Sequence, residues 1–237
     1  MTTRPSHDEL NRLETASAED LLRWGLDRFA GRIAVASSFG VEDVALIDMA
    51  ARLSPGVRVF TLDTGRLHQA TYDVMDRLRN RYELRLEVLF PDSADVESMV
   101  SEHGVNLFYD STEHRKHCCH VRKVKPLGRV LAAVDAWVTG LRREQSVTRT
   151  HVAKASVDDA NGGIIKLCPL ADWSEAQVWE YVRDRKIPYN ALHDQGYPSI
   201  GCEPCTRPIK PGDDPRAGRW WWENPETKEC GLHLSHD

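Results

Sequence analysis

The stretch RIAVASSFGVED (residues 32–43) is the clearest indication of the fold of this 237-residue chain. Its first half is a run of small and β-branched residues, which is typical of a buried strand. A turn containing Ser and Gly follows and leads directly into a helical pattern over residues 41–52. A strand, a tight turn and a helix in this order predict the first half of a right-handed strand–helix–strand unit.

The same alternation continues through the first two thirds of the chain. It predicts further strands at 57–63, 84–90 and 136–140, and further helices at 66–81, 94–103 and 121–134. Ser17 and Ser174 are typical N-caps, so two more helices are expected to begin after them. We therefore predict an α/β fold with a doubly wound, mostly parallel sheet.

Two parts of unequal character are expected. Residues 1–187 form the α/β domain, whereas residues 188–237 are rich in Pro and Gly and predict an irregular C-terminal segment. The aromatic run at 220–222 is expected to dock this segment, with stacking on a nucleobase as the alternative. The formal net charge of −5 argues against nucleic acid as the main partner. The N-terminus has no apolar leader and no apolar stretch is long enough for a membrane span, so we expect a cytoplasmic protein.

Candidate ligand-binding residues follow the predicted strands. In an open parallel sheet, ligands bind beyond the carboxyl ends of the strands. Small hydroxyl residues and glycine at a helix N-terminus are suited to a phosphate, although they also form ordinary turns. Guanidinium groups suit phosphate or sulfate oxygens, although an arginine cluster is also a common solvated face. The candidates are Ser37, Ser38 and Gly40; then Leu62, Asp63, Thr64 and Gly65; then Arg142, Arg143 and Arg149.

Six cysteines in a reducing compartment favour metal or redox chemistry over disulfide bonds. Cys118 and Cys119 are adjacent, and Cys202 and Cys205 form a CxxC pair. Four thiolates suit zinc, but an adjacent pair crowds one tetrahedral ion, whereas an iron–sulfur cubane takes one Cys at each corner. The pattern therefore favours iron–sulfur chemistry, with Lys123 beside it as a compensating charge. Cys168 lies in an apolar run and is expected in the core.

The remaining cysteine, Cys230, stands alone near the C-terminus, three positions before His233. Chain ends are usually poorly ordered, so a structural thiol has little reason to be there. We interpret Cys230 as a thiol that must move.

Taken together, SSFGVED, LDTGRLH, CC-x-x-RK-x-x-PL, TGLRREQS, GCEPCTR and ECGLH, in this order, resemble the assimilatory adenylyl-sulfate reductases of the phosphosulfate reductase family. The resemblance implies an adenine nucleotide alpha hydrolase-like sheet related to the PP-loop enzymes. It also implies one [4Fe–4S] cluster per subunit on Cys118, Cys119, Cys202 and Cys205. Cys230 would be the nucleophile, thioredoxin the reductant, and sulfite and AMP the products of adenosine 5′-phosphosulfate (APS).

The implied attack by a thiolate on an anionic substrate needs neutralising charge. The candidates for this role are Lys123, Arg142, Arg143, Arg216, Arg219 and His233.

Three alternatives stay open. They are a reductase of 3′-phosphorylated APS (PAPS) that carries a cluster, a PP-loop enzyme that activates nucleotides, and a redox sensor. The PP-loop signature Ser-Gly-Gly-x-Asp-Ser reads Ser-Ser-Phe-Gly-Val-Glu-Asp here, which argues against ATP cleavage. Assembly into a homo-oligomer is compatible with all of them.

Overall fold

The computed structural model describes residues 4–146, 149–224, 228 and 232. The chain divides into two compact units. The first comprises Met1–Thr61, Gln69–Glu87 and Leu131–Ala191, and the second comprises Leu62–His68, Val88–Val130 and Leu192–Asp237. The sequence did not indicate that two internal segments group with the C-terminal part, and the expected domain boundary after residue 187 stays a prediction.

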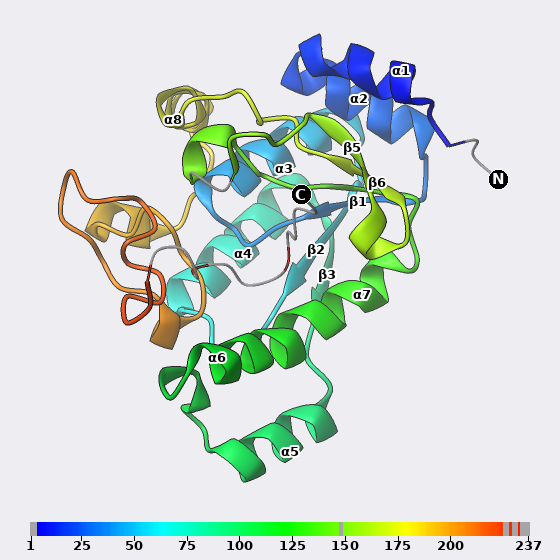
Figure 1. The fold of residues 1–237 in the computed structure, drawn as a ribbon. Helices are drawn as coiled ribbons and strands as arrows, with labels where there is room; N and C mark the ends of the chain where they lie inside the picture. The colour runs from blue at the N-terminus through cyan, green and yellow to red at the C-terminus, as the bar shows by residue number, and fades with distance from the viewer. Residues whose placement is uncertain (1–3, 147–148, 225–227, 229–231, 233–237) are drawn as a thin grey trace. The chain divides into compact units, whose positions relative to one another are not determined.

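A six-stranded sheet, ordered β3-β2-β1-β4-β6-β5, organises the first unit (Figure 1). β1 is parallel to β2 and to β4, β4 is parallel to β6, and only β5 is shown to run antiparallel, at the edge beside β6. The strands are β1 Ile33–Ala36, β2 Arg58–Leu62, β3 Arg85–Leu89, β4 Ala136–Val138, β5 Ala155–Asp158 and β6 Ile164–Leu167.

The strand order places a topological switch point between β1 and β4. The chain moves outward from β1 to β2 and β3, and then returns to the other side of β1 as β4. The loops after β1 and β4 therefore leave neighbouring strands at one end of the sheet and diverge, which is where open α/β sheets bind ligands.

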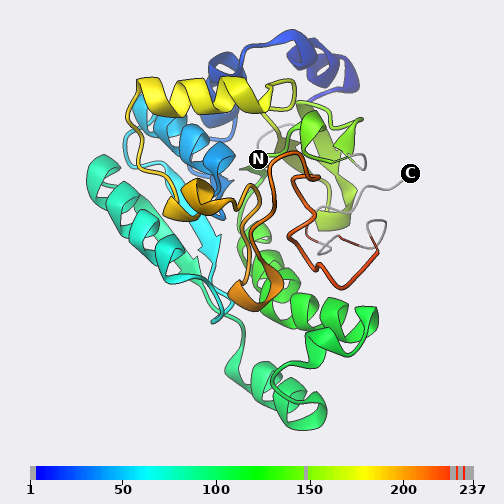
Figure 2. The same ribbon diagram turned by 90° about the vertical axis from the view of Figure 1, so that its left-hand side faces the viewer.

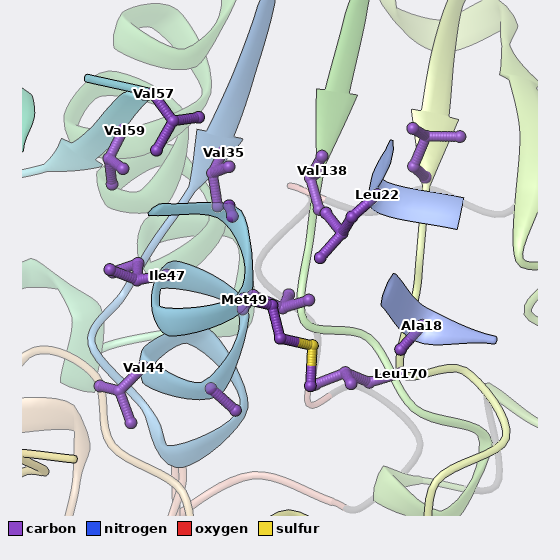
Figure 3. Packing of buried hydrophobic residues seen from close by; sticks show 14 of the residues in the cluster. Ala18, Leu22, Val35, Val44, Ile47, Met49, Val57, Val59, Val138 and Leu170 are labelled. Carbon is purple, nitrogen blue, oxygen red and sulfur yellow. The ribbon is translucent and has the colours of Figure 1, made fainter. Parts of the chain in front are cut away.

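Helix α3 (Val41–Leu53) forms the centre of the core beside β1. It packs between α2 (Ala18–Arg28) and α8 (Glu175–Asp184). Figure 3 shows Met49 of α3 among apolar side chains from the strands and from α2. Most of α3 is buried, so its sequence is apolar on nearly all sides rather than along one stripe. Two further helices of this unit are α1 (His7–Arg12) and α4 (Gln69–Tyr82).

The second unit consists of helices and irregular chain. Its helices are α5 (Ser93–His103), α6 (Thr112–Cys119) and α7 (Lys125–Leu131), and a turn of π-helix at His120–Val124 joins the last two. In Figure 2 the green helices α6 and α7 run on from one another, and the described part of the orange and red C-terminal chain contains only short helical turns. π-turns within helices occur frequently at functional sites.

The strand predicted in the first half of residues 32–43 and the strands predicted at 57–63, 84–90 and 136–140 are confirmed, as are the N-caps Ser17 and Ser174. β5 and β6 were missed, because each is only a four-residue strand without a clear alternating pattern. The predicted helix at 121–134 is wrong at its start. Ser111 caps α6 by accepting a hydrogen bond from the His114 amide (3.1 Å), so the adjacent cysteines lie inside a helix rather than before one. Among the described residues, no helix has the length and apolar character needed to cross a membrane.

Candidate active site

In the first unit, the loop after β1 folds back onto the first turn of α3. Ser38 donates two hydrogen bonds to the Asp43 carboxylate, one from its amide (2.6 Å) and one from its hydroxyl (2.8 Å). The Ser37 hydroxyl accepts a hydrogen bond from the Phe39 amide (3.0 Å). Gly40 is the N-cap of α3, so all three predicted phosphate-binding residues lie at the N-terminus of a helix.

Asp43 organises this loop, and sequence reasoning did not select it. Its side chain is buried, and burial raises its pKa to about 6, although the hydrogen bonds from Ser38 act in the opposite direction. An acidic residue three positions after a helix N-cap was the available signal.

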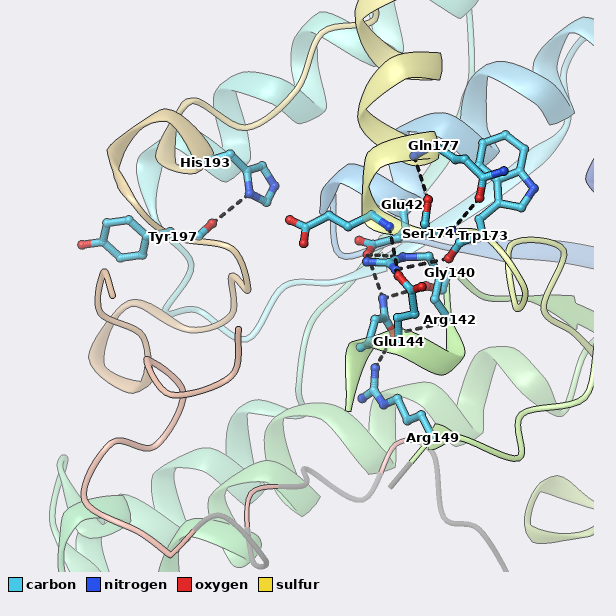
Figure 4. Close-up of polar contacts among 12 residues, drawn as sticks. Glu42, Gly140, Arg142, Glu144, Arg149, Trp173, Ser174, Gln177, His193 and Tyr197 are labelled. Carbon is cyan, nitrogen blue, oxygen red and sulfur yellow. Dashed lines mark hydrogen bonds and ion pairs between the residues drawn. The ribbon is translucent and has the colours of Figure 1, made fainter. Parts of the chain in front are cut away.

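The loop after β4 carries an arginine cluster whose members are already engaged. Arg142 is buried and its guanidinium forms ion pairs with Glu42 (2.9 Å) and Glu144 (3.6 Å), as Figure 4 shows. Gln145 donates a second hydrogen bond to Glu42 (2.9 Å) and accepts one from Arg149 (2.7 Å). Glu42 thus connects the loops after β1 and β4, and the role of these arginines toward a ligand stays a prediction.

Arg143 points into a different environment. Its guanidinium contacts the Glu14 carboxylate and donates to the carbonyl oxygen of Val152 (2.9 Å). The structure therefore separates Arg143 from the Glu42 network, although the two arginines are neighbours in sequence.

Gly140 allows the two loops of the first unit to approach each other. A Cβ atom at this position would lie 2.6 Å from an Asp43 carboxylate oxygen and 2.9 Å from the Glu42 Cβ. The glycine at the start of TGLRREQS is thus explained by the close approach of SSFGVED.

In the second unit, the loop after β2 faces a cysteine. Asp63 accepts a hydrogen bond from the Gly65 amide (2.8 Å), which holds a turn in which Gly65 has φ = 71°. The Thr64 hydroxyl lies 3.2 Å from the Cys202 sulfur, and the Thr64 carbonyl accepts a hydrogen bond from Arg122 (2.7 Å). Leu62 is the last residue of β2. The sequence indicated this loop as a ligand-binding candidate and did not indicate its contact with Cys202.

One pocket of the second unit gathers the adjacent cysteine pair and the CxxC pair. All four of these cysteines are buried, with residue exposures of 7–9%. Four cationic side chains share the pocket with them. Its lining consists of Arg66, Phe108, Arg115, Cys118, Cys119, Arg122, Lys123, Cys202, Pro204, Cys205 and Trp220.

The thiols of this pocket differ in acidity. Burial raises the pKa of Cys118, and it raises that of Cys205 to about 12. Burial opposes ionisation of Cys202 as well, but the charge of Lys123 and the hydrogen bond with Thr64 outweigh it, so the pKa of Cys202 is lowered. The charge of Lys123 thus acts on Cys202, whereas its role beside a cluster stays a prediction.

Three buried N–H groups near these thiols have no hydrogen-bond partner among the described residues. They are Nε of Arg122, Nε of Arg219 and Nε1 of Trp220. Unpaired buried donors are rare, and each calls for an explanation such as an acceptor group that is not part of the protein. The described residues also contain no set of three His, Cys, Asp or Glu side chains grouped to hold a single metal ion.

Trp220 anchors the C-terminal segment in the second unit. Its side chain is buried and packs in the same apolar cluster as the four pocket cysteines, so the expectation that this aromatic run docks the segment is confirmed for Trp220. The guanidinium groups of Arg219 and Arg216 lie 4.7 and 6.0 Å from its ring centroid. Arg216 and Arg219 are thus brought together around one indole ring.

Cys230 and His233 lie outside the described residues. Cys168 is 1% exposed and burial raises its pKa to about 12, which confirms it as a core residue of the first unit.

Comparison with known proteins identifies relatives over most of the chain. Residues 32–208 match the family described as the phosphoadenosine phosphosulfate reductase domain. An adenosine 5′-phosphosulfate reductase from Burkholderia cepacia is 55% identical over 206 residues, covering 86% of this chain and 81% of its own length. The corresponding enzyme from Allochromatium vinosum is 50% identical over 228 residues, covering 96% of this chain and 88% of its own length.

Solved structures agree on the fold. A phosphoadenylyl-sulfate reductase from Candida auris superposes with a TM-score of 0.74 at 27% identity, covering 87% of this chain and all of that chain. An FMN adenylyltransferase from Candida glabrata gives a TM-score of 0.58 at 16% identity, covering 99% of this chain and 79% of that chain, which supports the fold alone. The sheet is therefore of the adenine nucleotide alpha hydrolase-like type, as the sequence resemblance implied.

Substituting Gly140 tests the contact between the two loops of the first unit. Gly140→Ala places a methyl group against Asp43 and Glu42, so we expect a loss of about 1–3 kcal/mol in the free energy of unfolding. Gly128→Ala is the matched control, because nothing lies near a Cβ there and Gly128 is inside α7; it should gain about 0.5–1 kcal/mol. Urea unfolding measures both, and equal effects of the two substitutions would contradict the close approach.

The raised pKa of Asp43 predicts a pH dependence of stability. Between about pH 4 and 6 the folded state binds a proton at Asp43 that the unfolded chain does not, so stability should fall as pH rises through this window. Asp43→Asn removes this titration. We expect wild type to gain up to about 3 kcal/mol relative to the variant as pH falls from 7 to 4, measured by urea unfolding. A stability difference that does not change with pH would contradict the shift.

Proposed function

The chain belongs to the phosphoadenosine phosphosulfate reductase family, and we propose that it reduces APS to sulfite and AMP in sulfate assimilation, with thioredoxin as the reductant. The observation that carries the proposal is the buried, cation-lined pocket in which the adjacent cysteine pair meets the CxxC pair. Relatives that are 50–55% identical are APS reductases, which favours APS over PAPS as substrate.

The four cysteines of the pocket suit a [4Fe–4S] cluster, one per subunit. Cys118, Cys119, Cys202 and Cys205 would hold it, each supplying one thiolate. Fit is supported by the buried donors of Arg122 and Trp220, because N–H groups next to cluster sulfurs stabilise their negative charge. When bound, the cluster would supply a fixed cross-link between α6 and the CxxC segment and a strong local charge.

A single metal ion fits this donor set less well. The described residues do not place three such donors around one point, as zinc would require. A cubane instead spreads its ligands over separate corners.

The reaction itself needs one protein thiol. The thiolate of Cys230 attacks the sulfur of APS, an S–S bond forms, the bond from sulfur to the phosphate oxygen breaks, and AMP leaves. Lys123, Arg216, Arg219 and His233 would neutralise the sulfate end, with Arg142, Arg143 and Arg149 as the candidates for the phosphate. The loop residues Ser37, Ser38, Gly40, Leu62, Asp63, Thr64 and Gly65 would bind the nucleotide.

Release of the product needs a second thiol. A thioredoxin thiolate attacks the Cys230 sulfur and expels sulfite, and the second thioredoxin thiol then resolves the mixed disulfide. Both electrons come from this dithiol, so no redox change elsewhere in the chain is required. Cys230 must therefore be reachable by a second protein after it has reached the substrate.

Two alternatives predict different products. A PAPS reductase would release sulfite faster from PAPS than from APS, and the similarity to the Candida auris enzyme is the observation in its favour. A PP-loop enzyme would consume ATP, and the fold likeness to an FMN adenylyltransferase is compatible with it. Sulfite release and ATP consumption, measured with each purified nucleotide, separate the three.

Removing a cluster ligand tests the cofactor. Cys119→Ser or Cys205→Ser should lose most of the iron and most of the activity, because three thiolates leave one corner open. Cys168→Ser is the matched control, since its thiol is buried in the core of the other unit, and it should keep about four iron atoms per chain. Iron and sulfide analysis after anaerobic purification decides, and full iron content in either ligand variant would contradict the assignment.

Omitting the reductant tests the nucleophile. Without thioredoxin the first step proceeds and the second does not, so protein mixed with APS should gain the mass of one SO3 group. The modification should map to Cys230, be absent from Cys230→Ser, and be released as sulfite by reduced thioredoxin. Intact-protein mass spectrometry measures it. Modification of Cys168, or of the serine variant, would rule out Cys230 as the nucleophile.

A further inference from the structure

A buried ion pair in the second unit has no role in the steps described so far. Arg115 and Glu223 have side-chain exposures of only 0% and 4%. Their contact is bidentate, with Nε to Oε1 at 2.8 Å and Nη2 to Oε2 at 2.7 Å. A buried charge that loses its partner is strongly destabilising, so each of these side chains depends on the other.

The two partners lie in different parts of the second unit, one on the helix that carries the cysteine pair and one in the C-terminal segment. Arg115 lies on α6, three and four residues before Cys118 and Cys119, so it shares a helix face with them and lines the same pocket. Glu223 ends the turn that begins at Trp220, where its amide donates to the Trp220 carbonyl (2.8 Å). This turn is the last continuous described part of the chain before Cys230.

Arg115 also holds the Trp220 turn through the indole ring of Trp220. The Arg115 guanidinium lies 4.6 Å from the Trp220 ring centroid, so one cation contacts both the carboxylate and the indole of this turn. Trp220 has φ = 40°, a left-handed backbone conformation that residues other than glycine rarely adopt. Such a conformation persists only where surrounding contacts enforce it.

Resting on the proposed function, we propose that Arg115 and Glu223 are positioning residues that couple the cysteine pocket to the base of the C-terminal segment carrying Cys230. The charged guanidinium of Arg115 lines the cysteine pocket, and its hydrogen bonds to Glu223 hold the turn. Coupling of this kind is reciprocal: an occupied pocket strengthens the hold on the turn, and an intact turn strengthens retention of the cluster.

A second attachment lies further along the segment. Arg216 donates a hydrogen bond to the carbonyl oxygen of Lys228 (2.5 Å), and the Lys228 ammonium lies 3.5 Å from the carbonyl of Ala217. The described contacts of this attachment are hydrogen bonds to backbone carbonyl groups, so it should open before the buried Glu223 ion pair does. Cleavage by trypsin after Lys228 therefore reports how firmly the segment is held.

The experiment compares Glu223→Gln with Glu113→Gln. Both remove one carboxylate, but Glu113 is an exposed residue of α6. In Glu223→Gln, trypsin cleavage after Lys228, followed by mass spectrometry, should be roughly tenfold faster than in wild type, because the open state is more populated. Loss of iron to a chelator under anaerobic conditions should also be several-fold faster. Glu113→Gln should match wild type in both rates.

The neutral pair separates coupling from simple packing. In Arg115→Met with Glu223→Gln, neither charge is left unpaired, so thermal stability should recover relative to Arg115→Met alone. Iron loss should stay fast, because the charge of Arg115 is missing from the pocket that it lines with Cys118 and Cys119. Recovery of wild-type iron retention in this double variant would show a purely structural role and overturn the proposal.

Three further outcomes bear on the proposal. Wild-type rates of both cleavage and iron loss in Glu223→Gln would overturn the proposal. If Glu223→Gln does not fold, Glu223→Asp keeps the charge with a shorter side chain and should show smaller changes in the same direction; wild-type rates in it would count against the coupling. If wild-type protein purified without oxygen holds no iron, the proposed cluster fails, whereas faster cleavage in Glu223→Gln would still support the anchoring role.

Discussion

The cost of burying charge is the constraint on which the second unit depends. Arg115 is fully buried beside four thiols, and removing a guanidinium from water is unfavourable unless anions or π-systems surround it. Glu223 and Trp220 meet this requirement from the C-terminal segment. That segment has little regular structure of its own, so its place in the unit depends on partners supplied by α6.

In the first unit, contacts between charged and polar side chains likewise hold the loops together. Ser38 and Asp43 close the loop after β1, while Glu42 receives Arg142 and Gln145 from the loop after β4. These contacts lie at the switch point of the sheet, where two neighbouring strands send their connections in opposite directions. Loops that are tied to each other lose little entropy when a ligand arrives, which favours tight binding.

Fold and chemistry are separable in this protein. An adenylyltransferase with 16% identity shares the sheet, so the sheet alone does not determine the reaction. The four pocket cysteines lie in the second unit, on a helix and a short turn rather than on the strands. In the proposed reaction the nucleophile comes from the chain end, which has to serve a small substrate and a protein reductant in turn.

The sequence by itself determined the alternation of strands and helices, the adjacent and CxxC cysteine motifs, and the family. These features depend on local periodicity and on motifs a few residues long. It could not determine that Thr64 touches Cys202, that Glu42 engages Arg142, or that Arg115 meets Glu223, since each joins residues 100 or more positions apart. It also placed the adjacent cysteines before a helix rather than within one, because the N-cap at Ser111 was overlooked. Only the tertiary structure decided which arginines are already paired, because a charged side chain takes its partner from whatever the fold brings within reach.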